Sequence, residues 1–255
     1  MPGRKRVFTL PSLSVSILAD RAAELKETTV NLRIEGKDAT IFEGNVSTCG
    51  HRVTTKTGGT RHCDGTNNDN NPCAGPTCTT ALDDANKVAN FGFDGYVIWC
   101  ALSKDCPEEE TNKTKSRRAF FQGFDDFLIT TIGNETPNGE DYWALCLNSA
   151  IAPVGGCQQK VKKDDEVLFA YATLNVTKYF LKFYGPKFAT INQPVVLTVT
   201  DGKGTPIQNA NVNGKKTDGN GHVSLTFDEA GTQLLKAEKS PDSVRSNQLV
   251  INVVA

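Results

Sequence analysis

Eight cysteines and four N-x-S/T tripeptides constrain this chain of 255 residues more than any other feature. In an oxidising compartment an even set of cysteines forms cross-links, whereas cytosolic enzymes keep their thiols mainly for metals or catalysis. The tripeptides are acceptors for N-glycosylation, which belongs to the same secretory route. We therefore predict a secreted, disulfide-bonded glycoprotein. The disulfide candidates are Cys49, Cys63, Cys73, Cys78, Cys100, Cys106, Cys146 and Cys157, and the glycosylation candidates are Asn45, Asn112, Asn134 and Asn175.

The N-terminus has the pattern of a secretory leader. A basic stretch from Arg4 to Arg6 precedes a largely apolar stretch from Val7 to Ala19, where cleavage could follow. We assign residues 1–27 to a signal peptide and leader. No later run reaches the roughly 18 apolar residues of a membrane span, so we expect no membrane span and a mature protein that is extracellular or in the cell wall.

The overall charge gives no indication of a partner. The formal net charge is -1, and 22% of the residues are charged. The basic cluster Lys113–Arg118 follows the acidic run Glu108–Glu110 and lacks the interleaved aromatic residues of a base-stacking surface. We expect no nucleic-acid partner, and the oligomeric state stays open.

The composition and strand pattern of the sequence change near Tyr184-Gly-Pro186, which predicts a domain boundary there. Residues 185–255 alternate as short strands with hairpin turns, which indicates an all-β, Ig-like sandwich. We interpret Asp201, Asp218 and Asn220 as turn residues instead of calcium ligands, because each lies beside glycine. The predicted strands are Val195–Thr200, a strand at Val212, Val223–Phe227, Leu234–Ala237 and Leu249–Val254.

Residues 28–184 carry one helical pattern among strands, which is typical of an α+β domain in a β-rich chain. Leu82, Ala85, Val88 and Ala89 recur at helical spacing within a helix predicted over Thr79–Ala89. Thr79 or Thr80 would cap it, with the acidic pair Asp83 and Asp84 near its positive end. The predicted strands are Thr28–Glu35, Asp126–Ile132, Tyr142–Leu147, Glu166–Ala172 and Tyr179–Phe183.

These motifs also carry a family resemblance. Val30-Asn-Leu-Arg-Ile-Glu-Gly36, Thr79-Thr-Ala-Leu-Asp-Asp-Ala85, Tyr142-Trp143 and Lys163-Asp-Asp-Glu-Val-Leu168 resemble the transcobalamin carboxyl-terminal-like domain. His62-Cys-Asp-Gly-Thr-Asn-Asn68, Gly75-Pro-Thr-Cys78, Phe124-Asp-Asp126 and Pro153-Val-Gly-Gly-Cys-Gln-Gln159 resemble its secreted fungal members, which add an Ig-like domain. Pro206-Ile-Gln-Asn-Ala-Asn-Val212 and Thr217-Asp-Gly-Asn-Gly221 look like bacterial-Ig and carboxypeptidase-regulatory-like modules. The resemblance implies a soluble-ligand-binding, β-grasp-like first domain in an extracellular or surface setting.

Residues 97–122 depart from that family pattern as an insertion. A retained intron is one explanation, because valine codons begin with a splice-donor dinucleotide and glutamine can supply an acceptor. Reads that join Tyr96 to Gly123 would establish it. Removing the segment leaves an even number of cysteines, and keeping it allows Cys100 to pair with Cys106.

The polar stretch that follows Cys63 is the candidate binding surface. Asp64, Thr66, Asn67, Asn68 and Asp69 place amides, a hydroxyl and carboxylates in a loop that disulfides would hold rigid. A plain Asx-rich turn explains the same composition. Pairing of Cys63 with Cys78 is the guess that proximity favours.

Aromatic residues could supply a stacking surface for sugar rings. The candidates are Tyr96, Trp99, Tyr142, Trp143 and Tyr171, of which we assign Tyr142 and Trp143 to the site. A place in the core is the alternative for Trp143.

Catalysis and metal binding have weaker support in the sequence. Asp125 with Asp126 would point to opposite faces of a strand, so the two cannot flank one glycosidic bond. His51 and His62 lie near Cys49 and Cys63 without the paired spacing of a zinc site. We expect no catalytic residues, no metal and no cofactor.

The sequence thus predicts a non-catalytic binding protein whose ligand is a cell-wall glycan or a small soluble molecule. A structural or adhesive cell-wall protein is the alternative, and a secreted hydrolase ranks third.

Overall fold

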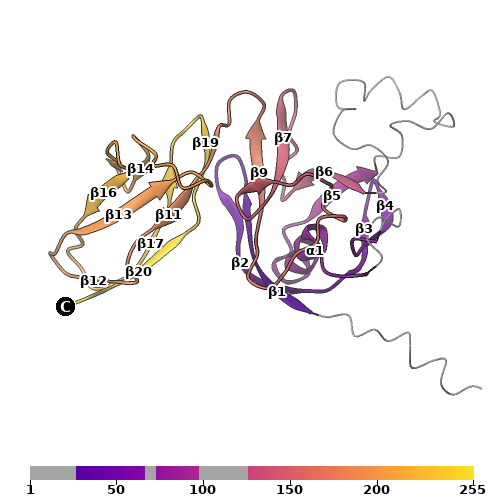
Figure 1. The fold of residues 1–255 in the computed structure, drawn as a ribbon, viewed down its shortest axis with the longest axis horizontal. Coiled ribbons are helices and arrows are strands. Elements are labelled where there is room, and N and C mark those ends of the chain that lie inside the picture. The colour runs from indigo at the N-terminus through magenta and orange to yellow at the C-terminus, as the bar shows by residue number, and fades with distance from the viewer. Residues whose placement is uncertain (1–26, 67–72, 98–125) are drawn as a thin grey trace, which may run out of the picture.

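The computed structural model describes residues 27–66, 73–97 and 126–255 (Figure 1). The pairing of Cys100 with Cys106 and glycosylation at Asn112 lie wholly outside these residues, as does the leader except for Glu27. Figure 1 shows an N-terminal part that contains the helix and a C-terminal part made of strands.

The N-terminal part contains strands from both ends of its sequence. Its elements are β1 (Thr28–Glu35), β2 (Thr40–Thr48), β3 (His51–Thr55), β4 (Gly59–Cys63), α1 (Cys78–Ala89), β5 (Phe93–Val97), β6 (Phe127–Ile132), β7 (Asp141–Leu147), β8 (Ala150–Ile151) and β9 (Glu166–Thr173).

A five-stranded sheet in the order β2-β1-β9-β7-β8 is the framework of this part. Strands β1 and β9 are parallel, and the other neighbours are antiparallel. The parallel pair joins the first and last long strands of this part, so the sheet depends on contacts between distant segments. The predicted strand Thr28–Glu35 is confirmed residue for residue.

Alternate residues of these strands form the core beneath the helix. Val30, Leu32 and Ile34 of β1 pack in one cluster with Leu82 of α1 and Phe169 of β9. Because side chains of a strand alternate between its faces, Asn31, Arg33 and Glu35 face the other way.

Helix α1 differs from the prediction at both ends. Its N-cap is Thr77, whose hydroxyl accepts from Thr80 N while the Thr80 hydroxyl accepts from Thr77 N, a reciprocal capping box. The predicted caps Thr79 and Thr80 are therefore wrong, and no acidic residue lies in the first turn.

The last turn of α1 extends past the sheet. Val88 is 86% exposed and Ala89 is also exposed, so their predicted place on the apolar face is wrong.

Two hairpins, β3-β4 and β5-β6, complete the N-terminal part. A disulfide joins Cys63, the last residue of β4, to Cys157. The guess that Cys63 pairs with Cys78 is wrong, because the backbone of Gly65 bonds to Cys157 O at 3.0 Å and holds that segment against the end of β4. Cys78 begins α1 and is buried in the helix core instead.

The predicted insertion falls between β5 and β6. Val97, the last residue of β5, and Phe127, the first residue of β6, are register partners, so the chain leaves and re-enters this hairpin at neighbouring points.

The C-terminal part is all β, as predicted. Its strands are β10 (Tyr179–Phe180), β11 (Lys182–Tyr184), β12 (Phe188–Thr190), β13 (Val195–Thr200), β14 (Asn211–Val212), β15 (Lys215–Lys216), β16 (His222–Leu225), β17 (Gly231–Leu235), β18 (Ala237–Glu238), β19 (Ser243–Val244) and β20 (Leu249–Val254).

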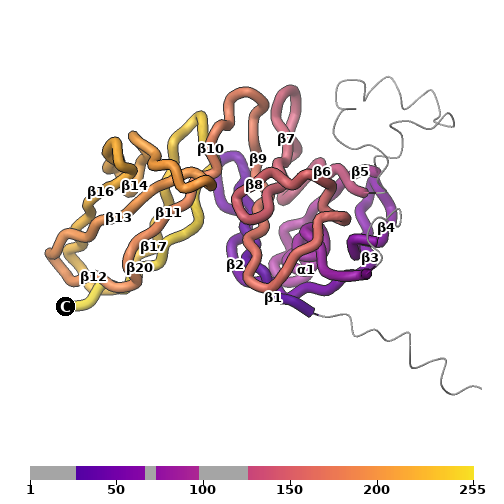
Figure 2. Tube along the Cα trace, viewed as in Figure 1, coloured from indigo at the N-terminus to yellow at the C-terminus, as the bar shows by residue number. Residues whose placement is uncertain are grey.

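Two three-stranded sheets, β11-β13-β16 and β12-β20-β17, contribute to a second apolar core (Figure 2). Leu181 and Phe183 belong to this core. The strand predicted at Tyr179–Phe183 as part of the first domain is thus misplaced: it divides into β10 and β11, which pair with β19 and β13.

The turns of this part use Asp201 and Asp218 as predicted. Asp201 Oδ1 accepts from Lys203 N and Thr205 N, each at 2.8 Å, and Asp218 Oδ1 accepts from Asn220 N and His222 N, each at 2.9 Å. These bonds show the Asx-type turn chemistry that the sequence indicates.

The β-rich fold with one helix is confirmed for the described residues. Within them, no helix combines the length and apolar character needed to cross a membrane.

Candidate functional site

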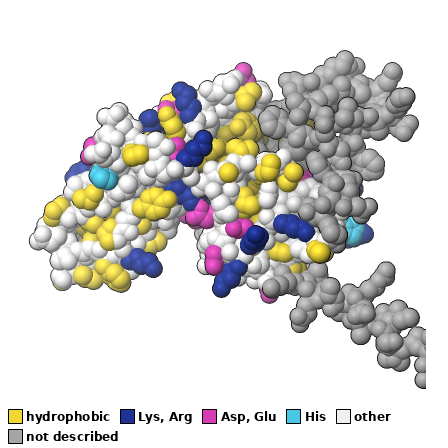
Figure 3. All heavy atoms as spheres, viewed as in Figure 1, with side chains coloured by type: hydrophobic (Ala, Val, Ile, Leu, Met, Phe, Trp, Pro, Cys, Tyr) yellow, Lys and Arg dark blue, Asp and Glu magenta, His cyan; other side chains and the backbone are white. Residues whose placement is uncertain are grey.

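The polar face of the five-stranded sheet meets the C-terminal part. Its residues form cross-strand rows set by the register: Asn45, Asn31 and Glu166 in one row, and Glu43, Arg33 and Leu168 in the next. Figure 3 shows charged side chains of both signs gathered where the two parts of the molecule meet.

The carboxylate of Glu35 is at the centre of this junction, with a side chain only 1% exposed. Lys236 Nζ lies 2.5 Å from its Oε1, and Arg245 Nε lies 3.0 Å from its Oε2. The Thr40 hydroxyl also donates to Oε2 at 3.0 Å. Both cations come from the C-terminal part, so a buried anion of β1 connects the two parts.

Further bonds fix the orientation of the junction. Arg245 donates from Nη2 to Gly36 O at 2.7 Å and from Nη1 to Lys37 O at 3.1 Å. Lys236 also pairs with Glu43 at 2.7 Å. Breaking such a desolvated network is costly, because its charges would be left without partners.

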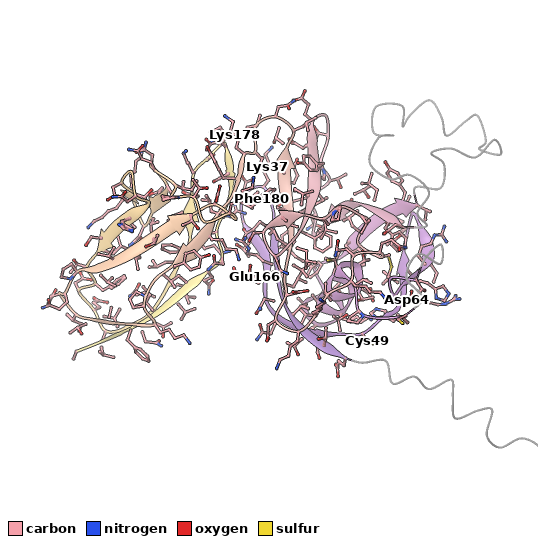
Figure 4. All side chains as sticks on the ribbon, in the orientation of Figure 1. Lys37, Cys49, Asp64, Glu166, Lys178 and Phe180 are labelled. Carbon is pink, nitrogen blue, oxygen red and sulfur yellow. A yellow bond between two sulfur atoms is a disulfide. The ribbon has the colours of Figure 1, made fainter. Side chains whose placement is uncertain are left out.

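A cleft of about 210 Å³ opens beside this network. Figure 4 places Glu166 and Phe180 between the two parts of the molecule, where the cleft lies. Side chains of both parts contribute to its wall, and these include Asn31, Arg33, Glu43, Asn45, Ser149, Glu166, Phe180, Lys182 and Asn247.

Arg33 supplies most of the unused hydrogen-bonding capacity of the cleft. Its side chain is 11% exposed, and Nη1 donates to Arg245 O at 2.6 Å. A guanidinium has five N–H donors, and among the described residues Arg33 makes this one hydrogen bond. Burial lowers the pKa of Arg33 from its usual value, while Glu35 opposes the shift. A ligand oxygen here would satisfy donors that are already removed from water.

The neighbouring Lys182 is paired with Glu166 across the cleft. Burial and the charge of Arg33 lower the pKa of Lys182. Arg33, Lys182, Glu43 and Glu166 have charges that sum to zero, so the cleft does not select a highly charged ligand.

Uncharged groups complete the lining. The Asn45 amide and the Ser149 hydroxyl have no hydrogen bond to any described residue, and the half-buried Phe180 adds an apolar ring. The Asn247 side-chain amide is already hydrogen-bonded within the protein, because it accepts from Phe183 N and donates to Phe183 O. The free groups therefore combine donors and acceptors beside one aromatic surface.

The predicted binding loop lies elsewhere. Figure 4 shows Asp64 on the side of the N-terminal part away from Phe180. Asp64 Oδ1 accepts from Thr66 N at 3.0 Å and from the Thr66 hydroxyl at 2.5 Å, the Asx-turn alternative. Asn67, Asn68 and Asp69 are outside the described residues.

The two predicted stacking residues do not share a surface. Trp143 is 7% exposed and meets Tyr171 edge-on in the helix core, with ring centroids 5.7 Å apart. Its assignment to a binding surface is wrong, because Trp143 is buried in the core cluster that also contains Ile132 of β6. Tyr142 points to the opposite, polar face and is half-buried there.

The remaining candidates are the cysteines predicted to form disulfides and the asparagines predicted to be glycosylated. Cys49, Cys73, Cys78 and Cys146 are free thiols. Asn134 and Asn175 are exposed, as glycosylation would require. Asn45 is exposed too, but a glycan on its amide would occupy the cleft that it lines, so glycosylation of Asn45 and ligand binding there exclude each other. Glycosylation itself stays a prediction.

The surroundings of Asp126, considered above as half of a catalytic pair, indicate a structural role. It is buried, and its carboxylate accepts from Phe127 N at 2.7 Å and from Cys157 N at 3.0 Å. Its partner Asp125 is outside the described residues.

Sequence reasoning missed Arg33, Asn45 and Phe180 as site residues. The alternation of β1 gives the same pattern whether its polar side faces solvent or another part of the protein. No local signal separates the two cases.

No protein-family model matches this chain, and no curated protein matches its sequence.

Proposed function

We propose that this protein is a secreted, non-catalytic binding protein that holds a saccharide unit of a cell-wall glycan in the cleft beside Arg33. The single observation that carries the proposal is a buried arginine with unused donors, lining a cleft built by both parts of the chain. Hydroxyl-rich ligands match the mixture of free donors and acceptors at Arg33, Asn45 and Ser149. Phe180 offers an apolar ring against which a sugar ring can stack.

The size of the cleft supports a small ligand. Its volume of about 210 Å³ lies below the roughly 300 Å³ at which pockets for drug-sized molecules begin. A single sugar unit, or the end of a longer chain, is the ligand that fits this limit. The resemblance of residues 28–184 to the transcobalamin carboxyl-terminal-like domain also favours a soluble-ligand-binding role.

The test is calorimetric binding to oligosaccharides of β-glucan, chitin and mannan. Arg33→Met removes the donors and keeps the aliphatic stem, whereas Arg52→Met makes the same change on the exposed side of β3. Asn45→Tyr fills the cleft at a residue whose amide has no hydrogen-bond partner in the described chain. We expect Arg33→Met and Asn45→Tyr to abolish saturable binding and Arg52→Met to preserve it.

A double Asp64→Ala, Asn68→Ala variant tests the loop that the sequence favoured. Loss of binding in this variant alone would contradict the cleft proposal and move the site to the loop. Arg33 also donates to Arg245 O, so Arg33→Met could unfold the protein. The thermal unfolding of each variant is therefore measured first. If Arg33→Met is unfolded, Asn45→Tyr alone tests the cleft. Absence of binding to every oligosaccharide would overturn the proposal.

A structural or adhesive wall protein is the second candidate, favoured by one observation. Phe188, Leu234 and Val250 are exposed on the sheet β12-β20-β17, where Leu234 and Val250 are cross-strand partners. Exposed apolar side chains on a sheet face are typical of contact surfaces. Retention by whole cell walls that survives loss of the cleft and is lost in a Phe188→Ser, Leu234→Ser variant would support this candidate.

A further inference from the structure

A second polar cluster lies on the N-terminal part, between β3 and α1. His51 is the first residue of β3, and Asp83 and Asp84 lie in the middle of α1. His51 Nε2 is 2.9 Å from Asp83 Oδ2 and 3.7 Å from Asp84 Oδ1. All three side chains are partly buried, so their donor atoms are held in place by the surrounding packing.

The second ring nitrogen of His51 is fixed by the backbone. Nδ1 lies 2.9 Å from Cys49 O, which can only accept a hydrogen bond, so Nδ1 carries the proton. Nε2, 2.9 Å from the acceptor-only Asp83 carboxylate, donates a proton to it, and a bound metal ion would take the place of that proton. Metal-binding histidines are oriented in the same way, with the other ring N–H donated to a carbonyl or carboxylate.

The ammonium group of Lys87 lies among these three donors. Its Nζ is 2.7 Å from Asp83 Oδ2, 2.7 Å from Asp84 Oδ1 and 3.2 Å from His51 Nε2. The cluster therefore already surrounds a cation with one nitrogen and two oxygens. The Lys87 side chain is 56% exposed and can turn into solvent without disturbing the core.

We propose that His51, Asp83 and Asp84 form a divalent metal site of the zinc class, in which the Lys87 ammonium holds the cation position until metal displaces it. The ligand atoms lie within 4.8 Å of one another. Donors bound at roughly 2.0–2.2 Å to one zinc ion are at most about 4.4 Å apart. Small side-chain rotations are thus enough to close the shell.

The ligand set favours zinc over calcium. Calcium requires six to eight oxygen ligands, whereas imidazole with carboxylates suits zinc and related transition metals. Three protein ligands leave one tetrahedral position for water, as in open zinc sites. The cluster is separate from the cleft, so this proposal does not depend on the proposed function.

A simple ion-pair network and a metal site predict opposite effects for Lys87→Met. If the network is only structural, the variant loses its cation, and Zn²⁺ binds it no better than the native protein. If the cluster is a metal site, removal of the competing ammonium tightens Zn²⁺ binding by about tenfold, the loss of two competing ion pairs.

The experiment is calorimetric titration with Zn²⁺ of the native protein and its variants. We expect one ion per chain, tighter binding by Lys87→Met, and no saturable binding by His51→Gln or Asp83→Asn. His62→Gln is the matched control, because His62 is an exposed histidine on the neighbouring strand β4. Equal binding by His51→Gln and His62→Gln would overturn the proposal, as would no tightening in Lys87→Met.

Cobalt spectra test the ligand set directly. Co²⁺ in the native site should show the visible bands of nitrogen and oxygen coordination and no thiolate charge-transfer band. Such a band, lost in Cys49→Ser, would show that Cys49 is a ligand and contradict the set proposed here. Unfolding temperatures without metal show whether each variant is folded before binding is compared.

Discussion

The two faces of the five-stranded sheet are made by alternate residues of the same strands and are buried by different means. One face packs Val30, Leu32 and Ile34 beneath the helix α1. On the other face, Arg33 and Glu35 are covered by the C-terminal part, which supplies the cations Lys236 and Arg245 to Glu35 and the backbone carbonyl of Arg245 to Arg33. The helix face is apolar, whereas the junction face combines buried charges with a small apolar cluster of Cys146, Leu168, Ala170 and Val244.

The two faces contribute differently: the apolar face mainly stabilises the fold, and the charged face mainly fixes how the two parts are oriented. Burial of apolar area stabilises a fold directly, at about 25 cal/mol per Å². A buried ion pair gains little net stability, because desolvation offsets most of the attraction between the charges. The charged face is therefore better explained by the orientation it fixes and by the polar cleft that this orientation creates.

The largest effect should come from the apolar face. Phe169→Ala removes one of the largest fully buried side chains beneath α1 and should lower the free energy of unfolding by about 3–5 kcal/mol. Chemical denaturation measures this directly. A loss below about 1 kcal/mol would show that this core collapses around the cavity and would weaken the contrast between the faces.

The second effect probes the junction face. Glu35→Gln leaves Lys236 and Arg245 without their buried anion and should destabilise the protein by about 3 kcal/mol, as when one partner of a buried pair is removed. The same denaturation experiment measures it.

A matched variant separates charge from packing at the same position. Replacing Glu35 with Leu, and Lys236 and Arg245 with Met, removes all three charges while retaining apolar volume. We expect a smaller loss of stability than in Glu35→Gln, because among the buried charges only Arg33 loses its ion-pair partner, and loss of ligand binding, because the cleft would lose its polar frame. Native binding by this triple variant would contradict the role given to the junction.

The third effect concerns the disulfide that ties the β3-β4 hairpin to the segment before β9. Cys63→Ser with Cys157→Ser should cost about 2–4 kcal/mol, the usual range for a cross-link over a long loop. The sequence separation here is 94 residues. Reduced and oxidised native protein compared by thermal unfolding give an independent value, and equal stabilities would refute the assigned structural role.

Three strands were predicted with their correct bounds, whereas β2, β3, β4 and β5 were not predicted. Thr28–Glu35, Val195–Thr200 and Leu249–Val254 have the predicted bounds, because alternation and flanking turns specify such strands locally. The helix was found, but its cap was not, because Thr77, Thr79 and Thr80 have the same local chemistry. Thr77 is the N-cap because it forms the capping box with Thr80, which the sequence alone does not indicate.

The candidate site could not be predicted, because it depends on which surfaces meet. Arg33 and Glu35 have the spacing of a solvated strand face, and Lys236 and Arg245 come from a distant part of the chain. Asp64 shows the opposite case: its polar composition indicated a binding loop, but its carboxylate is used by the adjacent Thr66. Local composition cannot separate a free polar group from a satisfied one.

The smallest effect should come from polar contacts at the open end of the sheet. Asp141 accepts from the Thr173 hydroxyl at 2.6 Å and the Tyr171 hydroxyl at 2.8 Å, and these bonds hold the pKa of Asp141 below its usual value. A carboxylate with a lowered folded pKa stabilises the protein above its unfolded pKa of about 3.9. The contribution is lost as the pH falls through the lower, folded pKa.

Asp141→Asn should therefore lower the unfolding temperature slightly at neutral pH and leave it unchanged at strongly acidic pH. Thermal unfolding across this range measures the difference between the two proteins. Equal losses at both ends would show that the bonds act without the charge, and Glu140→Gln, an exposed neighbour, controls for general charge effects.

The hydrogen-bonded pair of Asp141 and Tyr171 also predicts a loss of stability at alkaline pH. Burial and the hydrogen bond to Asp141 raise the pKa of Tyr171 to about 12. A raised folded pKa gives stability that is complete below the unfolded pKa of about 10 and is lost as the pH rises toward the folded value. Tyr171→Phe should remove this alkaline loss.

The most direct test of the central claim is an NMR titration of the full chain with glucan, chitin and mannan oligosaccharides, following Arg33 Nε–H and the Asn45 side-chain amide. If the polar junction builds the binding cleft, one oligosaccharide class shifts both resonances saturably, with a single dissociation constant. Saturable shifts confined to Asp64 and Thr66, with Arg33 and Asn45 unmoved, would contradict the claim.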